Sequence, residues 1–209
     1  MTGAVLPMFP LGAVLFPHAP LALHVFEERY RALMRDCLAG DREFGVVLID
    51  RGHEVGGGDH RTDVGTVASI VRAQELPDGR WALVATGGRR IRVARWLADD
   101  PYPRAEVTTI PEPPWPDDAL ADDALAGAER LVRRSLALRA ELDEPAPPMG
   151  VELSSSPAAA AWELASLAPL GPLDRQRLLS IDDPVARLAE LNSLTEDACT
   201  VLAQRLAGF

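Results

Sequence analysis

A proline-rich segment divides this 209-residue chain into two parts of different character. Four of the six residues at positions 111–116 are proline, which lacks a backbone N–H and has a fixed φ, so the segment is excluded from a helix interior or a central strand. We therefore predict a stiff, extended linker over residues 111–116. It separates a first domain, residues 1–110, from a second domain, residues 117–209.

Strand patterns dominate the first domain. Apolar or alternating runs bounded by turn residues predict strands at residues 5–9, 21–26, 44–49, 64–76, 81–86, 89–97 and 104–110. One amphipathic helix is predicted at residues 27–38, where Tyr30, Leu33 and Cys37 recur at helical spacing. Short antiparallel strands with one inserted helix predict a small closed or half-closed β-barrel.

Residues 87–97 predict a break between two strands and the exposure of one strand face. Gly87 and Gly88 are expected to separate two strands. In the second of these strands, Arg90, Arg92 and Arg95 alternate with apolar residues, which predicts one buried face and one solvent face.

The second domain has helical patterns throughout. Helices are predicted at residues 117–142, 158–167, 173–180 and 183–206, interrupted by prolines and glycines. Leu120, Leu131 and Leu138 recur at multiples near seven in the first of them, and Ser156-Pro157 and Asp183-Pro184 have the form of helix starts. Four such helices should pack as a bundle, so the whole chain is predicted to be of the α+β class.

The charge composition excludes several kinds of chemistry. All 21 basic residues are arginine, so a Walker A lysine, a Schiff-base lysine and a Ser–Lys dyad are all absent from these residues. The net charge of −10 divides unevenly: residues 1–110 hold 13 Arg against 14 acids, and residues 111–209 hold 8 Arg against 17 acids. Neither part has the basic footprint that nucleic-acid backbones require.

Candidate metal, catalytic and redox residues are few. His53-Glu54 and Asp59-His60 flank the glycines at 56–58, but a glycine-rich loop holds ligands poorly and the spacing matches no zinc pattern. His24, within a predicted strand, is expected to be a hydrogen-bonded structural residue. We therefore predict no metal, no cofactor and no catalytic residue. Cys37 and Cys199 are expected to be small core residues. No targeting signal or membrane span is found, which predicts a cytoplasmic protein.

Several segments resemble a known family. Residues 6–11 (LPMFPL), 14–17 (VLFP) and 20–31 (PLALHVFEERYR) are similar to the opening of the N-terminal, substrate-binding domain of Lon protease. Residues 44–49, 64–67 and 76–80 continue the resemblance in the family's order, and residues 175–179 and 187–188 fit its helical part. The resemblance implies a PUA-like β pseudo-barrel followed by a helical bundle, and recognition of unfolded or tagged polypeptides.

We therefore predict a non-enzymatic polypeptide-recognition module, acting as an adaptor in protein quality control with a cytosolic ATP-dependent protease as partner. The alternative is an RNA-binding protein that uses the arginines at positions 89–95; we expect neither nucleic acid nor membrane as a partner. For Phe26 and Tyr30 burial in the core is the favoured alternative to peptide contact, whereas Glu28 and Arg29 are expected on the surface. The peptide-binding candidates are Phe26, Glu28, Arg29, Tyr30 and Trp81.

Overall fold

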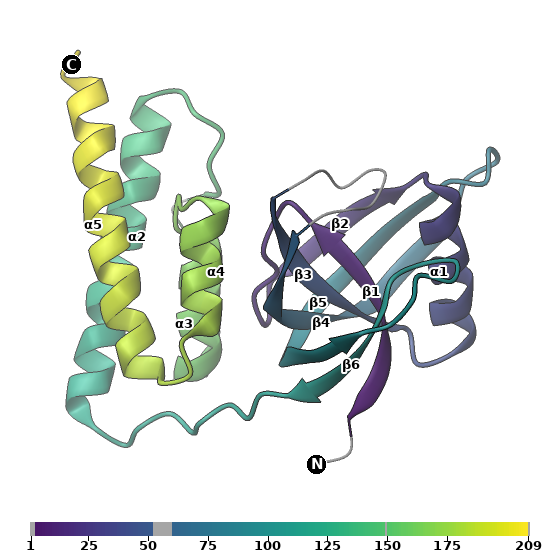
Figure 1. Ribbon diagram of the computed structural model, residues 1–209. Helices are drawn as coiled ribbons and strands as arrows, with labels where there is room; N and C mark the ends of the chain where they lie inside the picture. The colour runs from purple at the N-terminus through teal and green to yellow at the C-terminus, as the bar shows by residue number, and fades with distance from the viewer. Residues whose placement is uncertain (1–2, 52–59, 149, 209) are drawn as a thin grey trace. The chain divides into compact units, whose positions relative to one another are not determined.

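The computed structural model describes residues 3–51, 60–148 and 150–208 (Figure 1). The chain forms two compact units, Met1–Pro111 and Glu112–Phe209, and each is described by itself. The first unit contains β1 (Ala4–Leu11), β2 (Pro20–Val25), α1 (Glu28–Ala39), β3 (Glu43–Arg51), β4 (His60–Glu75), β5 (Trp81–Trp96) and β6 (Arg104–Thr109). The second contains α2 (Ala119–Glu141), α3 (Pro157–Leu167), α4 (Pro172–Ser180) and α5 (Pro184–Leu206).

The strands of the first unit close into a barrel. They are ordered β2-β5-β4-β3-β1-β6, and an additional pairing of β5 with β6 completes a ring of β5, β4, β3, β1 and β6. The α+β class and the single helix inserted among the strands agree with the prediction. β2 lies outside the ring, because it pairs with the first part of β5.

The barrel is antiparallel as predicted in every described pairing except that of β1 with β3. Residues Met8 to Leu11 of β1 pair in parallel with residues Gly45 to Leu48 of β3, whereas the earlier residues of β1 pair antiparallel with β6. The chain crosses from β1 to β3 through β2 and α1, and a crossover of this length is what permits two strands to run in parallel.

The expected break at Gly87 and Gly88 was wrong, because both glycines lie within the single long strand β5. They mark the point where one edge of β5 changes its partner, from β2 before the glycines to β6 after them. A Cβ atom at Gly87 would collide with the backbone oxygen of Phe16, so the loop before β2 can approach the strand only at a glycine. The loop is fixed there by hydrogen bonds from His18 N–H to Gly87 O (2.8 Å) and from Gly87 N–H to Ala19 O (2.9 Å).

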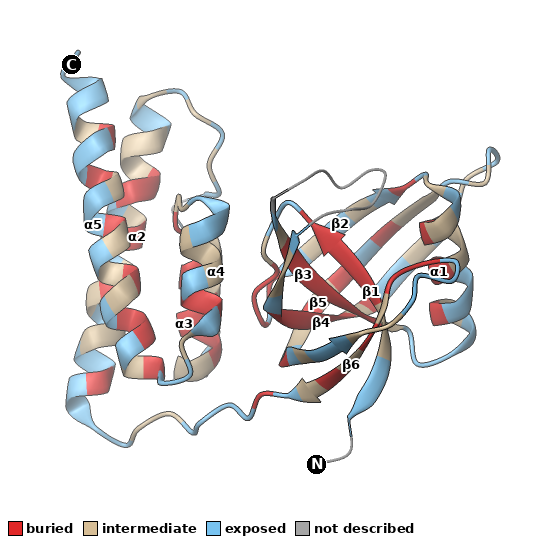
Figure 2. Ribbon diagram, viewed as in Figure 1, coloured by how far each residue is buried: buried red, intermediate tan, exposed pale blue. Residues whose placement is uncertain are grey.

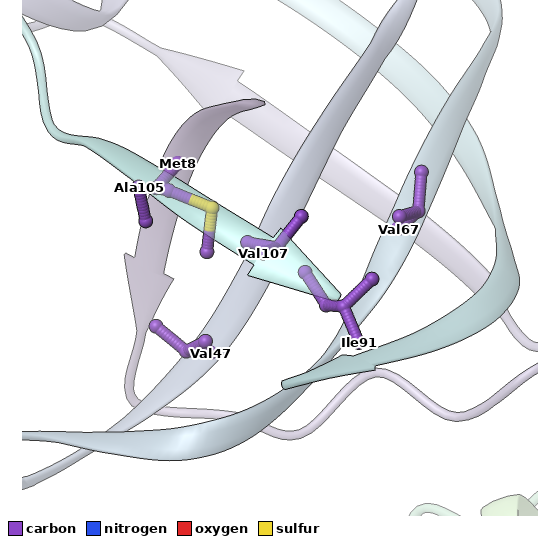
Figure 3. Packing of buried hydrophobic residues seen from close by; sticks show 6 residues of the cluster. All are labelled: Met8, Val47, Val67, Ile91, Ala105 and Val107. Atoms are coloured by element: carbon purple, nitrogen blue, oxygen red, sulfur yellow. The ribbon is translucent and has the colours of Figure 1, made fainter. Parts of the chain in front are cut away.

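The barrel interior is filled by small and medium apolar side chains from five strands (Figure 3). Gly45 allows Met8 to cross this interior, since a Cβ atom at Gly45 would overlap the Met8 sulfur. Because the space is packed in this way, the barrel holds no central ligand cavity among its described residues, and binding must use its outer surface. The central cluster is Met8, Val47, Val67, Ile91, Ala105 and Val107.

The second unit is a set of helices whose buried residues form stripes (Figure 2). The observed bounds lie within two residues of the predicted ones. Asp183 caps α5 by accepting a hydrogen bond from the Ala186 N–H at 2.6 Å, whereas Ser156, before α3, makes no side-chain capping bond. The leucines at multiples near seven in α2 are not its buried face. That face is Ala121, Ala128, Val132, Ser135 and Leu136.

Candidate functional site

The residues predicted to contact peptide lie where β2 ends and α1 begins. Phe26 follows the last residue of β2 and is 59% exposed, so the favoured expectation that it belongs to the core was wrong. Burying a phenylalanine normally stabilises a fold by about 2 kcal/mol, and this one is left in solvent. An exposed aromatic residue at a rigid strand end is a suitable anchor for an apolar partner.

Tyr30, in contrast, is a core residue. It is 3% exposed, and its ring stacks on Phe9 with the centroids 4.0 Å apart and the planes inclined by 12°. Phe9 in turn contacts Phe44 of β3 at 6.0 Å. This aromatic cluster fixes the first turn of α1 against β1 and β3, which positions the neighbouring Phe26.

Glu28 and Arg29 are arranged differently from each other. Glu28 is exposed and accepts an ion pair from Arg31 of the same helix at 2.9 Å. Arg29 is largely covered: it pairs with Glu27 at 3.1 Å, and its guanidinium lies over the Tyr30 ring, 4.6 Å from the centroid. Glu28 also pairs with Arg35 of α1 at 3.5 Å. Both residues therefore have partners within the chain, and they differ in exposure: Glu28 is open to solvent, whereas Arg29 is largely covered.

Trp81 begins β5 directly opposite Val25, the residue before Phe26. Its indole Nε1 is buried and has no hydrogen-bond partner within the part of the chain that the structure describes. The pairing of β2 with β5 therefore places Trp81 beside Val25, one position from Phe26, although more than fifty positions separate Trp81 from Phe26 in the sequence.

The surface around β2 has two features that the sequence did not indicate. A cavity of about 80 Å³ lies between the end of β1, the end of β2 and the start of α1, and both Phe26 and Tyr30 line it. A shallow groove of about 360 Å³ runs over β2, β5 and β4, lined in part by Ala22, His24 and Val84. Leu23 and His24 border both depressions, so both adjoin β2.

The environment of His24 differs from the predicted one. It is exposed, and it was predicted to be a hydrogen-bonded structural residue. The alternation in β2 was a usable signal: Leu21, Leu23 and Val25 point to the more buried side, and Ala22 and His24 to the solvent. Val84 could not be identified in this way, because only the pairing register places it opposite Ala22.

The arginines at positions 89–95 do not form a free basic surface. Arg89 pairs with Glu43 at 2.8 Å, Arg92 pairs with Asp63 at 2.9 Å, and Arg95 pairs with Glu106. Arg90 was expected on the solvent face but is 0% exposed. Its ladder partner Thr66 is also 0% exposed and donates its hydroxyl to Leu15 O at 2.6 Å, so the segment before β2 covers this part of the sheet. These neighbours neutralise the footprint on which RNA binding depended.

The candidate metal ligands are only partly described. His53, Glu54 and Asp59 lie outside the described residues. His60 Nδ1 lies 2.6 Å from Asp50 Oδ1, as a simple exposed pair. Within residues 3–51, 60–148 and 150–208 no three His, Cys, Asp or Glu side chains are placed to hold a metal ion together.

Comparison with known proteins identifies relatives over nearly the whole chain. The family model of the ATP-dependent protease La (LON) substrate-binding domain matches residues 5–197. A Lon protease from Trichlorobacter lovleyi is 33% identical over 198 residues, which cover 91% of this chain and 23% of that protein. A LON peptidase N-terminal domain and RING finger protein from Schizosaccharomyces pombe is 25% identical, over 88% of this chain and 43% of that protein. The chain thus spans about a quarter to two fifths of these relatives.

Solved structures give the same result. A crystal structure of a Lon N-terminal domain protein from Xanthomonas campestris has a TM-score of 0.63 and 34% identity, covering 91% of this chain and 98% of that one. The N-terminal domain of a Mycobacterium avium complex Lon protease shares the fold, with a TM-score of 0.64 and 19% identity over 93% of this chain. Among the helices of the described residues, none combines the length and apolar character needed to cross a membrane.

Proposed function

Because this chain belongs to the Lon substrate-binding domain family, we propose that it binds unfolded polypeptide segments in extended form along β2, with Phe26 as the apolar anchor. The observation that carries this proposal is the exposure of Phe26 at the end of β2, which among the described strands pairs with β5 alone. Binding is proposed to occur without catalysis by this chain.

The edge of β2 supplies the backbone part of recognition. Among the described strands β2 pairs with β5 alone, so its second edge is not used within the sheet. Such an edge can take up an extended peptide through main-chain hydrogen bonds, which are independent of the peptide's sequence. This property suits a protein that recognises many unfolded chains.

The depressions beside β2 supply the side-chain part. Successive side chains of an extended peptide alternate between two faces, so such a peptide would direct them alternately toward the cavity at Phe26 and toward the groove at Val84. The cavity of about 80 Å³ admits only the end of a side chain, with Tyr30 forming part of its wall. Glu28 and Arg29 are proposed to lie at the charged rim of this site, and Trp81 to support it from β5.

The wider role follows from the family relationship. We propose that the protein acts in the cytoplasm as an adaptor in protein quality control, delivering bound polypeptides to an ATP-dependent protease. We further propose that the barrel is of the PUA-like type and that residues 111–116 link it to the helical domain. Enrichment of protease subunits in an affinity purification from the native host, compared with a Phe26→Ala bait, tests the adaptor role.

Binding itself is tested with reduced, carboxymethylated α-lactalbumin, which stays unfolded, by fluorescence anisotropy. Phe26→Ala should weaken binding about tenfold, the usual effect of removing a central aromatic anchor. The matched control is Leu120→Ala, which removes an even more exposed apolar side chain (73%) from the helical unit and should leave the affinity unchanged. A Glu28→Ala/Arg29→Ala double variant should weaken binding less than Phe26→Ala does.

A second experiment tests the extended binding mode. A short peptide from the bound region, N-methylated at every second residue, keeps its side chains but loses alternate backbone donors. It should lose its affinity if it pairs with β2. Full retention would disprove strand addition, and equal binding by Phe26→Ala would disprove the site. Absence of binding by the unaltered protein would disprove the function itself.

A further inference from the structure

The helical unit contains a cavity whose charge is opposite to that of its surroundings. Residues 112–209 hold 8 arginines against 17 acidic residues, a net charge of −9. The cavity of about 610 Å³ nevertheless has three arginines and one glutamate in its wall, a net charge of +2. It lies between the end of α2, the segment that follows α3, and the last turns of α5. The charged lining residues are Arg139, Glu144, Arg175 and Arg205.

Glu144 shows what kind of group fits between two of these arginines. Its carboxylate accepts ion pairs from Arg205 Nη1 at 2.6 Å and from Arg139 Nε at 3.2 Å. Glu144 is on the segment after α2 and Arg205 is in the last turn of α5, so the pair joins elements distant in sequence. Two guanidinium groups that already hold one carboxylate are spaced to accept a second in its place or beside it.

Arg175 fixes the opposite wall. Its guanidinium donates hydrogen bonds to the backbone oxygens of Ser166 (3.2 Å) and Ala168 (3.4 Å), at the end of α3. This arginine is half-buried, so its charge is screened by water less than that of a fully exposed arginine. It therefore adds positive charge to the cavity while holding the wall rigid.

Most of the remaining lining residues are apolar. Leu167 and Leu170 come from α3 and the residues after it, and Ala198, Val201 and Leu202 come from α5. Val201 is 55% exposed although it lies well within a helix. A volume of about 610 Å³ is within the range of small-ligand sites, which combine apolar side chains with a few charged or polar groups as this wall does.

We propose that this cavity binds a small carboxylate with a short apolar body. The carboxylate pairs with Arg139 and Arg205, sharing them with Glu144 or displacing it, and the apolar body lies against Val201 and Leu202. The site is in the second unit and uses none of the residues proposed for polypeptide binding in the first, so the two proposals stand independently.

The experiment uses hexanoate as the probe and hexanamide as its uncharged control of the same size. Titration of the full chain is followed by the methyl NMR signals of Val201 and Leu202. Hexanoate should shift these signals saturably, with a Kd on the order of 1 mM for so small a ligand. Hexanamide should bind at least about fivefold more weakly. Equal binding of the two compounds, or shifts that do not saturate, would overturn the proposal.

Two variants with opposite expected effects separate binding from a general change in structure. Arg205→Gln should weaken hexanoate binding about tenfold, the effect of losing one charge-assisted hydrogen bond. Glu144→Gln removes the internal competitor and should strengthen it. Arg130→Gln, an exposed arginine of α2 outside the cavity, is the matched control and should leave the affinity unchanged. Equal affinity in the Arg205→Gln and Arg130→Gln variants would also overturn the assignment.

Discussion

The phenol of Tyr102 donates a 2.7 Å hydrogen bond to the Asp36 carboxylate, and thereby joins the connection before β6 to the last turns of α1. The two residues are 66 positions apart in the sequence. Tyr102 is buried, and Asp36 is at the exposed rim of the contact. The bond fixes the end of α1, the helix that begins two residues after the proposed anchor Phe26.

Tyr102→Phe should therefore destabilise the first unit by about 1–2 kcal/mol, the contribution of a hydrogen bond to a partly exposed charged group. The loss should be the same at pH 6 and pH 9. Burial, reinforced by Asp36, raises the pKa of Tyr102 to about 12, so the phenol is protonated in both states at these pH values. Its contribution is lost only as the pH rises from about 10 through 12. Urea unfolding at both pH values measures the change in the free energy of unfolding. The Asp36→Asn variant and the Asp36→Asn/Tyr102→Phe double variant complete a double-mutant cycle.

Gly87 and Gly88 provide a matched pair for testing the close approach of the loop before β2. Gly87→Ala should cost about 2–3 kcal/mol, because the new methyl group meets the backbone oxygen of Phe16, which has no freedom to move away. Gly88→Ala should change the free energy of unfolding by less than about 0.5 kcal/mol, because its nearest neighbour, Val67 O, is 3.4 Å away. Similar urea midpoints for the two variants would contradict the structure at this point.

Cys37 should be almost inert toward alkylation. Burial, with a smaller effect of Asp36, raises the pKa of its thiol to about 12, and its Sγ donates to Glu43 O at 3.3 Å. At pH 8 the thiolate fraction is then roughly a thousandfold below that of a free cysteine, and only the thiolate reacts. Iodoacetamide labelling followed by peptide mass spectrometry should find Cys37 unmodified in the folded protein and modified in urea. Rapid labelling without denaturant would show that α1 does not cover it.

Glu144 should make the helical unit sensitive to acid. Hydrogen bonds from Arg205 and then from Arg139 hold the pKa of its carboxyl below the ordinary value of about 4.3. A lowered native pKa contributes stability that is complete above the ordinary pKa and is lost as the pH falls through the native one. At pH 7 the unaltered protein should therefore have a higher urea midpoint of unfolding than the Glu144→Gln variant. The difference between the two midpoints should become smaller at pH 3. A constant difference would mean that the ion pairs do not act in solution.

The helices and strands themselves could be predicted from the sequence, because their signals are local. Prolines and glycines punctuate the chain, and the first turn of α5 is capped by Asp183 as the Asp-Pro pair suggested. Pairing direction could not be predicted in this way. Whether Met8 faces β3 in parallel or antiparallel depends on the path of the chain between them, which no local pattern encodes.

Local sequence patterns were also insufficient to predict which residues of the candidate site are exposed. Tyr30 and Phe26 have similar local surroundings in the sequence, four positions apart, yet one stacks on Phe9 and the other is exposed to solvent. The difference arises because α1 begins at Glu28, so Phe26 belongs to the end of the strand and not to the apolar face of the helix. Arg90 was also placed wrongly because its cover comes from a distant part of the chain: its ladder partner Thr66 is hydrogen-bonded to Leu15, in the segment before β2.

The pairing of β1 with β6 determines when the barrel can close during synthesis of the chain. Ala4 pairs with Val107, so these partners leave the ribosome 103 residues apart. At ordinary elongation rates that interval is roughly 5 to 20 s, during which β1 is translated but lacks its antiparallel neighbour. Nascent chains shorter than about 110 residues therefore expose an incomplete barrel to chaperones and proteases. A protein proposed to recognise unfolded polypeptides must itself pass through this state each time it is made.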